Sequence, residues 1–180
     1  MNGDGLVDNF DRSLLDYSII PKGYYGFGAA INFAGFDLSF LFNGQHGGYV
    51  NLNPIINSGT SANGFLNQYS VDRWTPTTGS AALWPRLGLA DRGNNTAAST
   101  FWIRSSDFIQ LRNLELGYTL PSKFINKIGM ESFRIYVNGY NIASFGGMKD
   151  LDLSPDLVTG GVYGSYPYLS TISGGINIRF

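Results

Sequence analysis

The feature that most constrains the fold is the alternation of apolar and polar residues over positions 166–180, YPYLSTISGGINIRF. Successive side chains of a strand point to opposite faces, so two interleaved sets of positions define two faces. Counted back from Phe180, one set is Ile178, Ile176, Gly174, Ile172, Ser170 and Tyr168, and the other is Arg179, Asn177, Gly175, Ser173, Thr171 and Leu169. The pattern predicts a strand of about 15 residues with one apolar and one polar face.

A strand of this length is unusual for a soluble sheet, where ~5–6 residues are typical. It fits the strands of membrane barrels, which alternate over ~10 residues, face lipid outside and a polar lumen inside, and carry aromatic residues at both interfaces. We therefore predict an all-β fold, an antiparallel up-and-down transmembrane β-barrel segment. The alternative is the edge strand of a soluble sheet.

Composition supports the membrane prediction. Aromatic residues make up 15% of the 180 residues and charged residues only 14%, a balance suited to strands that expose rings to lipid headgroups. No run of 18 apolar residues occurs, which leaves a closed barrel as the way to span a membrane. A net charge of −1 without a basic patch argues against nucleic acid as a partner, and the lack of cysteine excludes disulfides.

Two further strands are predicted on either side of a tight turn. Residues Tyr24–Phe33 and Phe36–Phe42 each alternate, and Ala34-Gly35 between them has the length of a two-residue hairpin loop. Such a loop pairs Phe33 with Phe36, so the apolar stripes of the two strands fall on one face.

Two more strands are predicted at Phe108–Leu120 and Phe133–Ala143. Within the first, the apolar positions change parity, which predicts a bulge or a change of environment near Arg112. Between them, Ser122–Ile128 has the pattern of one or two helical turns, ended by Gly129. With the final strand, the chain has five predicted strands.

The alternation along each strand assigns its residues to a lipid-facing or a lumen-facing side. Asp37, Glu115 and Arg134 are predicted to face the lumen, solvated by channel water. The predicted membrane-facing residues are Tyr25, Phe27, Ile31, Phe33, Phe36, Leu38, Phe40, Leu116, Tyr118, Ile135, Val137, Ile172, Ile176, Ile178 and Phe180. Short connections (34–35, 121–132) alternate with long ones (43–100, 144–165), as do periplasmic turns and extracellular loops of barrels.

The N-terminal residues 2–11, NGDGLVDNFD, follow the spacing of an EF-hand or dockerin calcium loop. With Gly5 at the sharp turn, oxygen ligands fall at regular offsets, although the first ligand would precede Met1. The predicted ligands are Asn2, Asp4, the Leu6 carbonyl, Asp8 and Asp11. A solvated Asn-Gly/Asp-Gly turn is the alternative.

Several blocks, taken in order, carry a family resemblance. They are NGDG at 2–5, RWTP at 73–76, FWIRSSDFIQLRNLELGYTLP at 101–121, RIYVNGYN at 134–141 and the ending GGINIRF at 174–180. The terminal phenylalanine with apolar residues at the third and fifth positions from the end resembles the C-terminal signal of bacterial outer-membrane barrels. Together these blocks resemble the C-terminal part of a SusC/RagA-type TonB-dependent outer-membrane transporter. The sequence DLSPD at 152–156 departs from the D-P-E expected in that family.

This resemblance implies the last five strands of a barrel of about 22 strands, with an N-terminal plug outside this chain. We expect the whole of residues 1–180 to belong to that barrel, with 1–20 as an extracellular calcium-loop-like segment and 24–180 as strands and loops. The lack of a signal peptide and the five strands both indicate part of a longer protein. The resemblance also implies the Gram-negative outer membrane, a SusD-type surface lipoprotein, energy through TonB, and uptake of oligosaccharides or peptides.

No catalytic constellation is evident, so we do not predict an enzyme. The single histidine, His46, lies among glycines, and no nucleophile motif accompanies it. Trp74, Trp84 and Trp102 are weak candidates for stacking on a sugar ligand, against loop packing or lid contacts. The competing function is a soluble calcium-dependent β-sandwich that binds carbohydrate.

Overall fold

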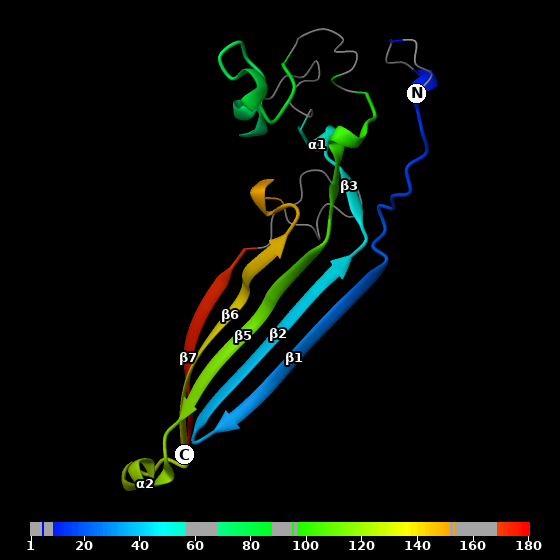
Figure 1. The fold of residues 1–180 in the computed structure, drawn as a ribbon. Helices are drawn as coiled ribbons and strands as arrows, with labels where there is room; N and C mark the ends of the chain where they lie inside the picture. Colours follow the sequence, from blue (N-terminus) through cyan, green and yellow to red (C-terminus); the bar gives the residue numbers. More distant parts are fainter. Residues whose placement is uncertain are drawn as a thin grey trace.

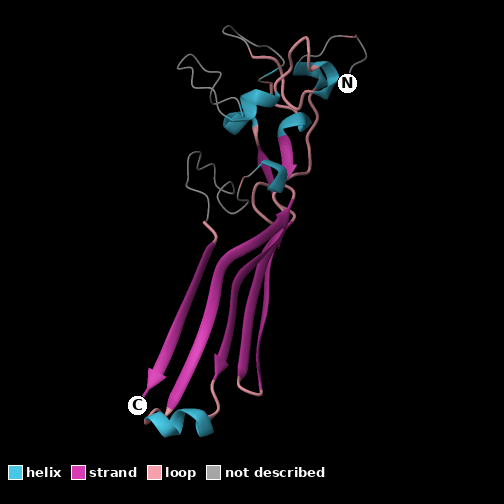
Figure 2. Ribbon diagram, turned by 90° about the vertical axis from the view of Figure 1, so that its left-hand side faces the viewer, coloured by secondary structure: helices cyan, strands magenta, loops and turns pink. Residues whose placement is uncertain are grey.

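The long strands form one antiparallel sheet (Figures 1 and 2). The structure, a computed structural model, describes residues 5, 9–56, 68–87, 95, 97–151, 153 and 169–180. The sheet has five strands in the order β1-β2-β5-β6-β7. Their bounds are Gly23–Phe33 (β1), Phe36–His46 (β2), Phe108–Thr119 (β5), Ser132–Gly146 (β6) and Thr171–Arg179 (β7). The five predicted strands are therefore present, each next to its predicted partner in a meander.

The predicted hairpin is confirmed. Phe33 lies opposite Phe36, and the two loop residues Ala34 and Gly35 have φ angles of 50° and 86°. Positive φ at both central positions is the geometry of a two-residue hairpin loop whose twist matches the strands. Glycine is favoured at position 35 for two reasons. Its φ is positive, and a Cβ there would lie 2.8 Å from the Thr119 carbonyl oxygen.

The predicted bulge is also confirmed. Leu41 lies opposite Asn113 while Phe42 lies opposite Leu111, which leaves Arg112 as the extra residue of β5. The pairing of β5 with β6 is also irregular at Arg112, because Leu111 lies opposite Ala143 and Asn113 opposite Tyr140, which leaves two residues of β6 against one of β5. The bulge explains why the apolar positions change parity there without leaving one face of the sheet.

Three strand boundaries differ from the sequence prediction by more than one residue. β2 continues to His46 and β6 to Gly146, because both keep pairing with β5 through the less regular sequence near its beginning. The final strand is shorter than predicted. It begins at Thr171, whereas residues 166–168 lie outside the described part of the chain and Leu169-Ser170 precede the strand.

The connection between β5 and β6 is helical, as predicted. It comprises α2, Ser122–Ile125, followed by the 3₁₀ turn η7, Asn126–Ile128. Gly129 ends it in the left-handed conformation, with φ 75°. α2 lies beyond the strand ends at the same end of the sheet as the β1–β2 hairpin and the C-terminus (Figures 1 and 2).

The opposite end of the sheet carries a second group of short elements. A two-stranded ribbon pairs β3, Tyr49–Asn51, with β4, Ile103–Ser105, and α1, Asn53–Ile56, follows β3. This end also carries short 3₁₀ turns, and another 3₁₀ turn lies near the N-terminus. These are η1 (Asn9–Asp11), η3 (Gln68–Asp72), η4 (Gly79–Ala81), η6 (Thr100–Trp102) and η8 (Lys149–Leu151). The stretch 43–100 is therefore a folded unit over much of its length.

β3, α1, η6 and η8 each contribute to a hydrophobic core, which we call the loop cap core. It consists of Val50, Leu52, Ile56, Trp84, Trp102, Met148 and Leu151, with Tyr69 and Leu153 packed against it. Leu52 and Met148 are fully buried although almost 100 residues separate them in sequence. Most buried hydrophobic side chains of the described residues thus belong to the loop cap core, and within the described part of the chain no second layer covers the long sheet (Figure 2).

Candidate functional site

The sheet has two chemically distinct faces. Directly opposed residues of antiparallel strands share a face, and the register aligns Phe27 with Phe42, Leu38 with Leu116, and Ile135 with Ile176. We call this side the apolar face. Every predicted membrane-facing residue that lies in a strand is on it.

The apolar face is open. Phe27 is 53% exposed, Ile135 48% and Ile176 58%. β6 has neighbours on both sides in the sheet, so the exposure of Ile135 is not caused by an open sheet edge. Large exposed apolar surfaces of this kind mark contact with lipid or another protein.

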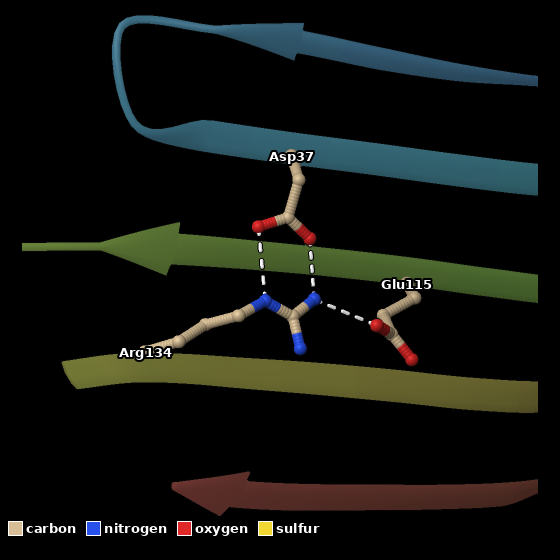
Figure 3. A network of polar contacts seen from close by, with 3 residues as sticks. All are labelled: Asp37, Glu115 and Arg134. Carbon is tan, nitrogen blue, oxygen red and sulfur yellow. Dashed lines mark hydrogen bonds and ion pairs between the residues drawn. The ribbon is translucent and has the colours of Figure 1, made fainter. Parts of the chain in front are cut away.

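The other side, the polar face, carries an ion triad of Asp37, Glu115 and Arg134 (Figure 3). The Arg134 Nε donates to Asp37 Oδ1 at 3.0 Å, and its Nη2 donates both to Asp37 Oδ2 and, at 2.7 Å, to Glu115 Oε1. The three side chains are 21–30% exposed. Fork-shaped pairing with two carboxylates is the geometry for which arginine is best suited.

The triad spans three strands because a glycine lies beneath it. Arg134 on β6 reaches Asp37 on β2 by passing over β5 (Figure 3). The contact crosses β5 at Gly117, where a Cβ would lie 2.5 Å from Arg134 Nη2 and from both Asp37 carboxylate oxygens. In the same row, Tyr136 lies over Gly175 of β7, and the Arg134 Cζ is 4.9 Å from the Tyr136 ring centroid. Glycine thus makes room for large polar side chains that lie flat on the sheet.

Sequence reasoning placed Asp37, Glu115 and Arg134 on one face, and the register confirms that they share it. Their mutual contact was not predicted, because it depends on the register of β2 against β5. Gly117 and Gly175 were not singled out at all. The signal that could have found them is glycine at polar-face positions of otherwise regular strands.

A group of hydrogen bonds, partly buried, links β1 and β2 to the segment between β4 and β5. Gln45 is 2% exposed, and its Nε2 donates to the Ser106 carbonyl oxygen at 2.8 Å and to Ser106 Oγ at 3.1 Å. Nearby, the Gly47 N–H donates to Asp107 Oδ1 at 2.7 Å and the Tyr25 hydroxyl donates to the Phe108 carbonyl at 2.8 Å. The 105–108 backbone is thereby fixed to the ends of β1 and β2.

The three tryptophans of the sequence prediction have different environments. Trp84 and Trp102 are 6% and 1% exposed, and their rings stack in parallel with centroids 6.1 Å apart. Both belong to the loop cap core, so packing occupies the ring faces that a sugar would need. Trp74 is 40% exposed and is the one of the three that offers a ring to solvent.

The predicted calcium loop lies largely outside the described residues. Asn2, Asp4, Leu6 and Asp8 are not described, and Asp11 ends η1. Among the residues that are described, no group of three or more His, Cys, Asp or Glu could hold a metal ion. The calcium site therefore stays a prediction from sequence.

No protein-family model matches the chain. Individual proteins, however, are similar to it in sequence. The chain is 25% identical over 190 residues to TonB-dependent receptor P3 of Formosa agariphila, covering 100% of this chain and 18% of that protein. It is 26% identical over 189 residues to TonB-dependent receptor P26 of the same organism, covering 99% of this chain and 19% of that protein.

Solved structures agree on the fold. The chain superposes on the RagAB peptide transporter with a TM-score of 0.66 at 23% identity, covering 92% of this chain and 18% of that one. For the RagAB peptide importer in the closed-closed state the TM-score is 0.65 at 20% identity, covering 98% of this chain and 20% of that one. The chain is similar in sequence to TonB-dependent receptors and shares the fold of part of the RagAB structures. The resemblance drawn from the sequence is thereby confirmed.

The chain spans about a fifth of the length of these receptors. Its antiparallel sheet matches part of their barrel fold.

Proposed function

We propose that this chain forms five neighbouring strands of the 22-stranded wall of an outer-membrane, TonB-dependent nutrient importer of Gram-negative bacteria. The observation that carries the proposal is the apolar face, which remains exposed on strands whose neighbours are in place. The relatives are TonB-dependent receptors, which supports a transporter and not an enzyme. In this arrangement the apolar face meets acyl chains and the polar face lines the lumen.

Topology supports the orientation of the wall. The short connections, Ala34-Gly35 and α2–η7, lie at one end of the sheet, and the loop cap core lies at the other (Figure 1). Outer-membrane barrels have short periplasmic turns and longer extracellular loops. We therefore place the cap outside the cell, together with the calcium-loop-like residues 1–20.

The proposed cargo is an oligosaccharide or a peptide, taken up with a SusD-type lipoprotein as partner and energy delivered through TonB. Peptide import is the activity named for the RagAB structures that share this fold. Trp74 remains a weak candidate for ligand contact, and calcium a candidate cofactor at residues 2–11.

The competing proposal, a soluble calcium-dependent β-sandwich, needs a second sheet across the apolar face. Among the described residues, the only other sheet is the β3–β4 ribbon, whose residues belong to the cap. A sandwich would bury Ile135 and Ile176, which are about half exposed here.

The test uses the full-length receptor. We expect it to require detergent for extraction, to show heat-modifiable gel mobility, and to co-purify with a surface lipoprotein. Deletion of its gene should abolish growth on the imported oligosaccharide or peptide. A protein extracted in full without detergent would overturn the proposal.

A further inference from the structure

The helical turn α2–η7 is exposed in a way that the sheet edges do not explain. It joins β5 to β6, and each of these strands has neighbours on both sides. The open edges of the sheet belong to β1 and β7 instead. Both views place α2 beyond the ends of the strands (Figures 1 and 2), so its surroundings are those of a barrel turn and not of an unpaired edge.

The turn has a fixed orientation. Ile125 is 3% exposed, and its carbonyl accepts a hydrogen bond from the Met130 N–H at 3.3 Å. Phe124, the preceding residue, is 60% exposed. One apolar side chain therefore anchors the turn to the protein while the adjacent aromatic ring is presented outward.

One cation lies near this ring and a second follows in sequence. The Lys123 ammonium lies 5.1 Å from the Phe124 ring centroid, and Lys127 lies in η7, three residues after Phe124. Residues 122–128, SKFINKI, contain no carboxylate, and the nearest acid along the chain is Glu131. An exposed ring flanked by lysines is a surface with apolar and cationic character together.

The same end of the apolar face is rich in aromatic residues. Phe33 lies opposite Phe36, which lies opposite Tyr118, and the first two are 79% and 54% exposed. Aromatic rings concentrate at the level of lipid headgroups, and lysines there extend their ammonium groups toward phosphate. The turn thus continues an aromatic band and adds positive charge to it.

We infer that α2–η7 is a lipid-binding element seated in the headgroup layer of the leaflet at the short-turn end of the barrel. Phe124 inserts at the boundary between headgroups and acyl chains, and Lys123 and Lys127 bind the phosphates of anionic phospholipids. Charge complementarity and continuity with the apolar face select lipid over a protein partner. The inference rests on the proposed function, since it requires the apolar face to lie in a bilayer.

The depth test uses a cysteine-free full-length receptor in nanodiscs of phosphatidylcholine and phosphatidylglycerol. A fluorophore is attached at Phe124→Cys or, as a reference, at Ile176→Cys on the apolar face, opposite Ile135. We expect quenching by shallow spin-labelled lipid at position 124 and by deep spin-labelled lipid at position 176.

The outcomes distinguish a failure of the lipid-binding turn from a failure of the proposed function. If position 176 is quenched by deep lipid but position 124 is reached only by aqueous iodide, the lipid-binding turn is wrong and the barrel wall stands. Shielding of position 124 from both lipid and iodide also overturns the inference, because the turn would then contact protein. If position 176 is not quenched by lipid, the proposed function itself fails.

The charge test measures the selectivity of the purified receptor for phosphatidylglycerol over phosphatidylcholine. Lys123→Gln and Lys127→Gln should each lower it about fivefold. Arg86→Gln, which removes one exposed positive charge from the cap, is the matched control and should leave it unchanged. Heat-modifiable mobility confirms that each variant folds. Unchanged selectivity in both lysine variants would overturn the inference.

Discussion

Replacing Val137 by arginine in the full-length receptor places a charge in the middle of the apolar face. Val137 is 45% exposed, on a strand with neighbours on both sides. It lies five positions after Ser132, where β6 begins, which is about 17 Å along a strand at ~3.3 Å per residue. A tilt of about 40° reduces this to about 13 Å of height, half of an apolar band of ~25 Å.

Arginine at the bilayer midplane of a barrel costs about 2–4 kcal/mol. That free energy lowers the ratio of folded to unfolded receptor about 30- to 700-fold. On a water-exposed surface, the same substitution would change stability by at most about 0.5 kcal/mol. The expected loss of stability for a lipid-facing Val137 is therefore several times larger than the loss for a water-exposed one.

The assay is the denaturant midpoint of the receptor folded into lipid vesicles, followed by heat-modifiable mobility. Asn138→Arg is the matched control, because Asn138 is the next residue of β6 and lies on the polar face opposite Glu115. We expect Val137→Arg to lower the midpoint strongly and Asn138→Arg to change it little. Equal effects of the two variants, or a tolerated Val137→Arg, would refute the assignment of the faces.

Three further predictions concern the cap, the ion triad and the calcium loop. Trp102→Ala should destabilise the loop cap core by about 3–5 kcal/mol, because the ring is 1% exposed. Limited proteolysis should then cleave the cap while the barrel keeps its heat-modifiable mobility. An uncut cap would contradict this. Arg134→Gln should lower the free energy of unfolding by about 1–3 kcal/mol, because it leaves two carboxylates together without their cation. Adding Asp37→Asn to the same chain should recover part of that stability. Additive effects in a double-mutant cycle would argue against the triad. Chelation by EGTA should lower the melting temperature of the receptor but not that of an Asp4→Asn/Asp8→Asn variant, and an equal or absent shift in both would exclude calcium there.

The features that sequence predicted correctly are those with short-range causes. The β1–β2 hairpin follows from a two-residue loop that fixes which residues pair, and the bulge at Arg112 follows from a change of parity within one strand. The helical turn ended by Gly129 has its signals within a few residues. In each case the local backbone geometry leaves one solution.

The features that sequence did not predict depend on long-range packing. The loop cap core joins Leu52, Trp102 and Met148, which have no common period, so no window of sequence contains its signal. Trp84 and Trp102 were candidates for ligand contact because an isolated tryptophan does not reveal whether its ring is packed. Strand extension to His46 and Gly146 likewise depends on pairing with β5.

The alternation of side chains along each strand is determined by the sequence alone, because the strand period of two is a property of the backbone. It defines an apolar and a polar face before any partner is known. Which residues meet across strands was decided by the tertiary structure. Arg134 reaches Asp37 because the register puts Gly117 between them, and a shift of one residue would place a side chain in that path.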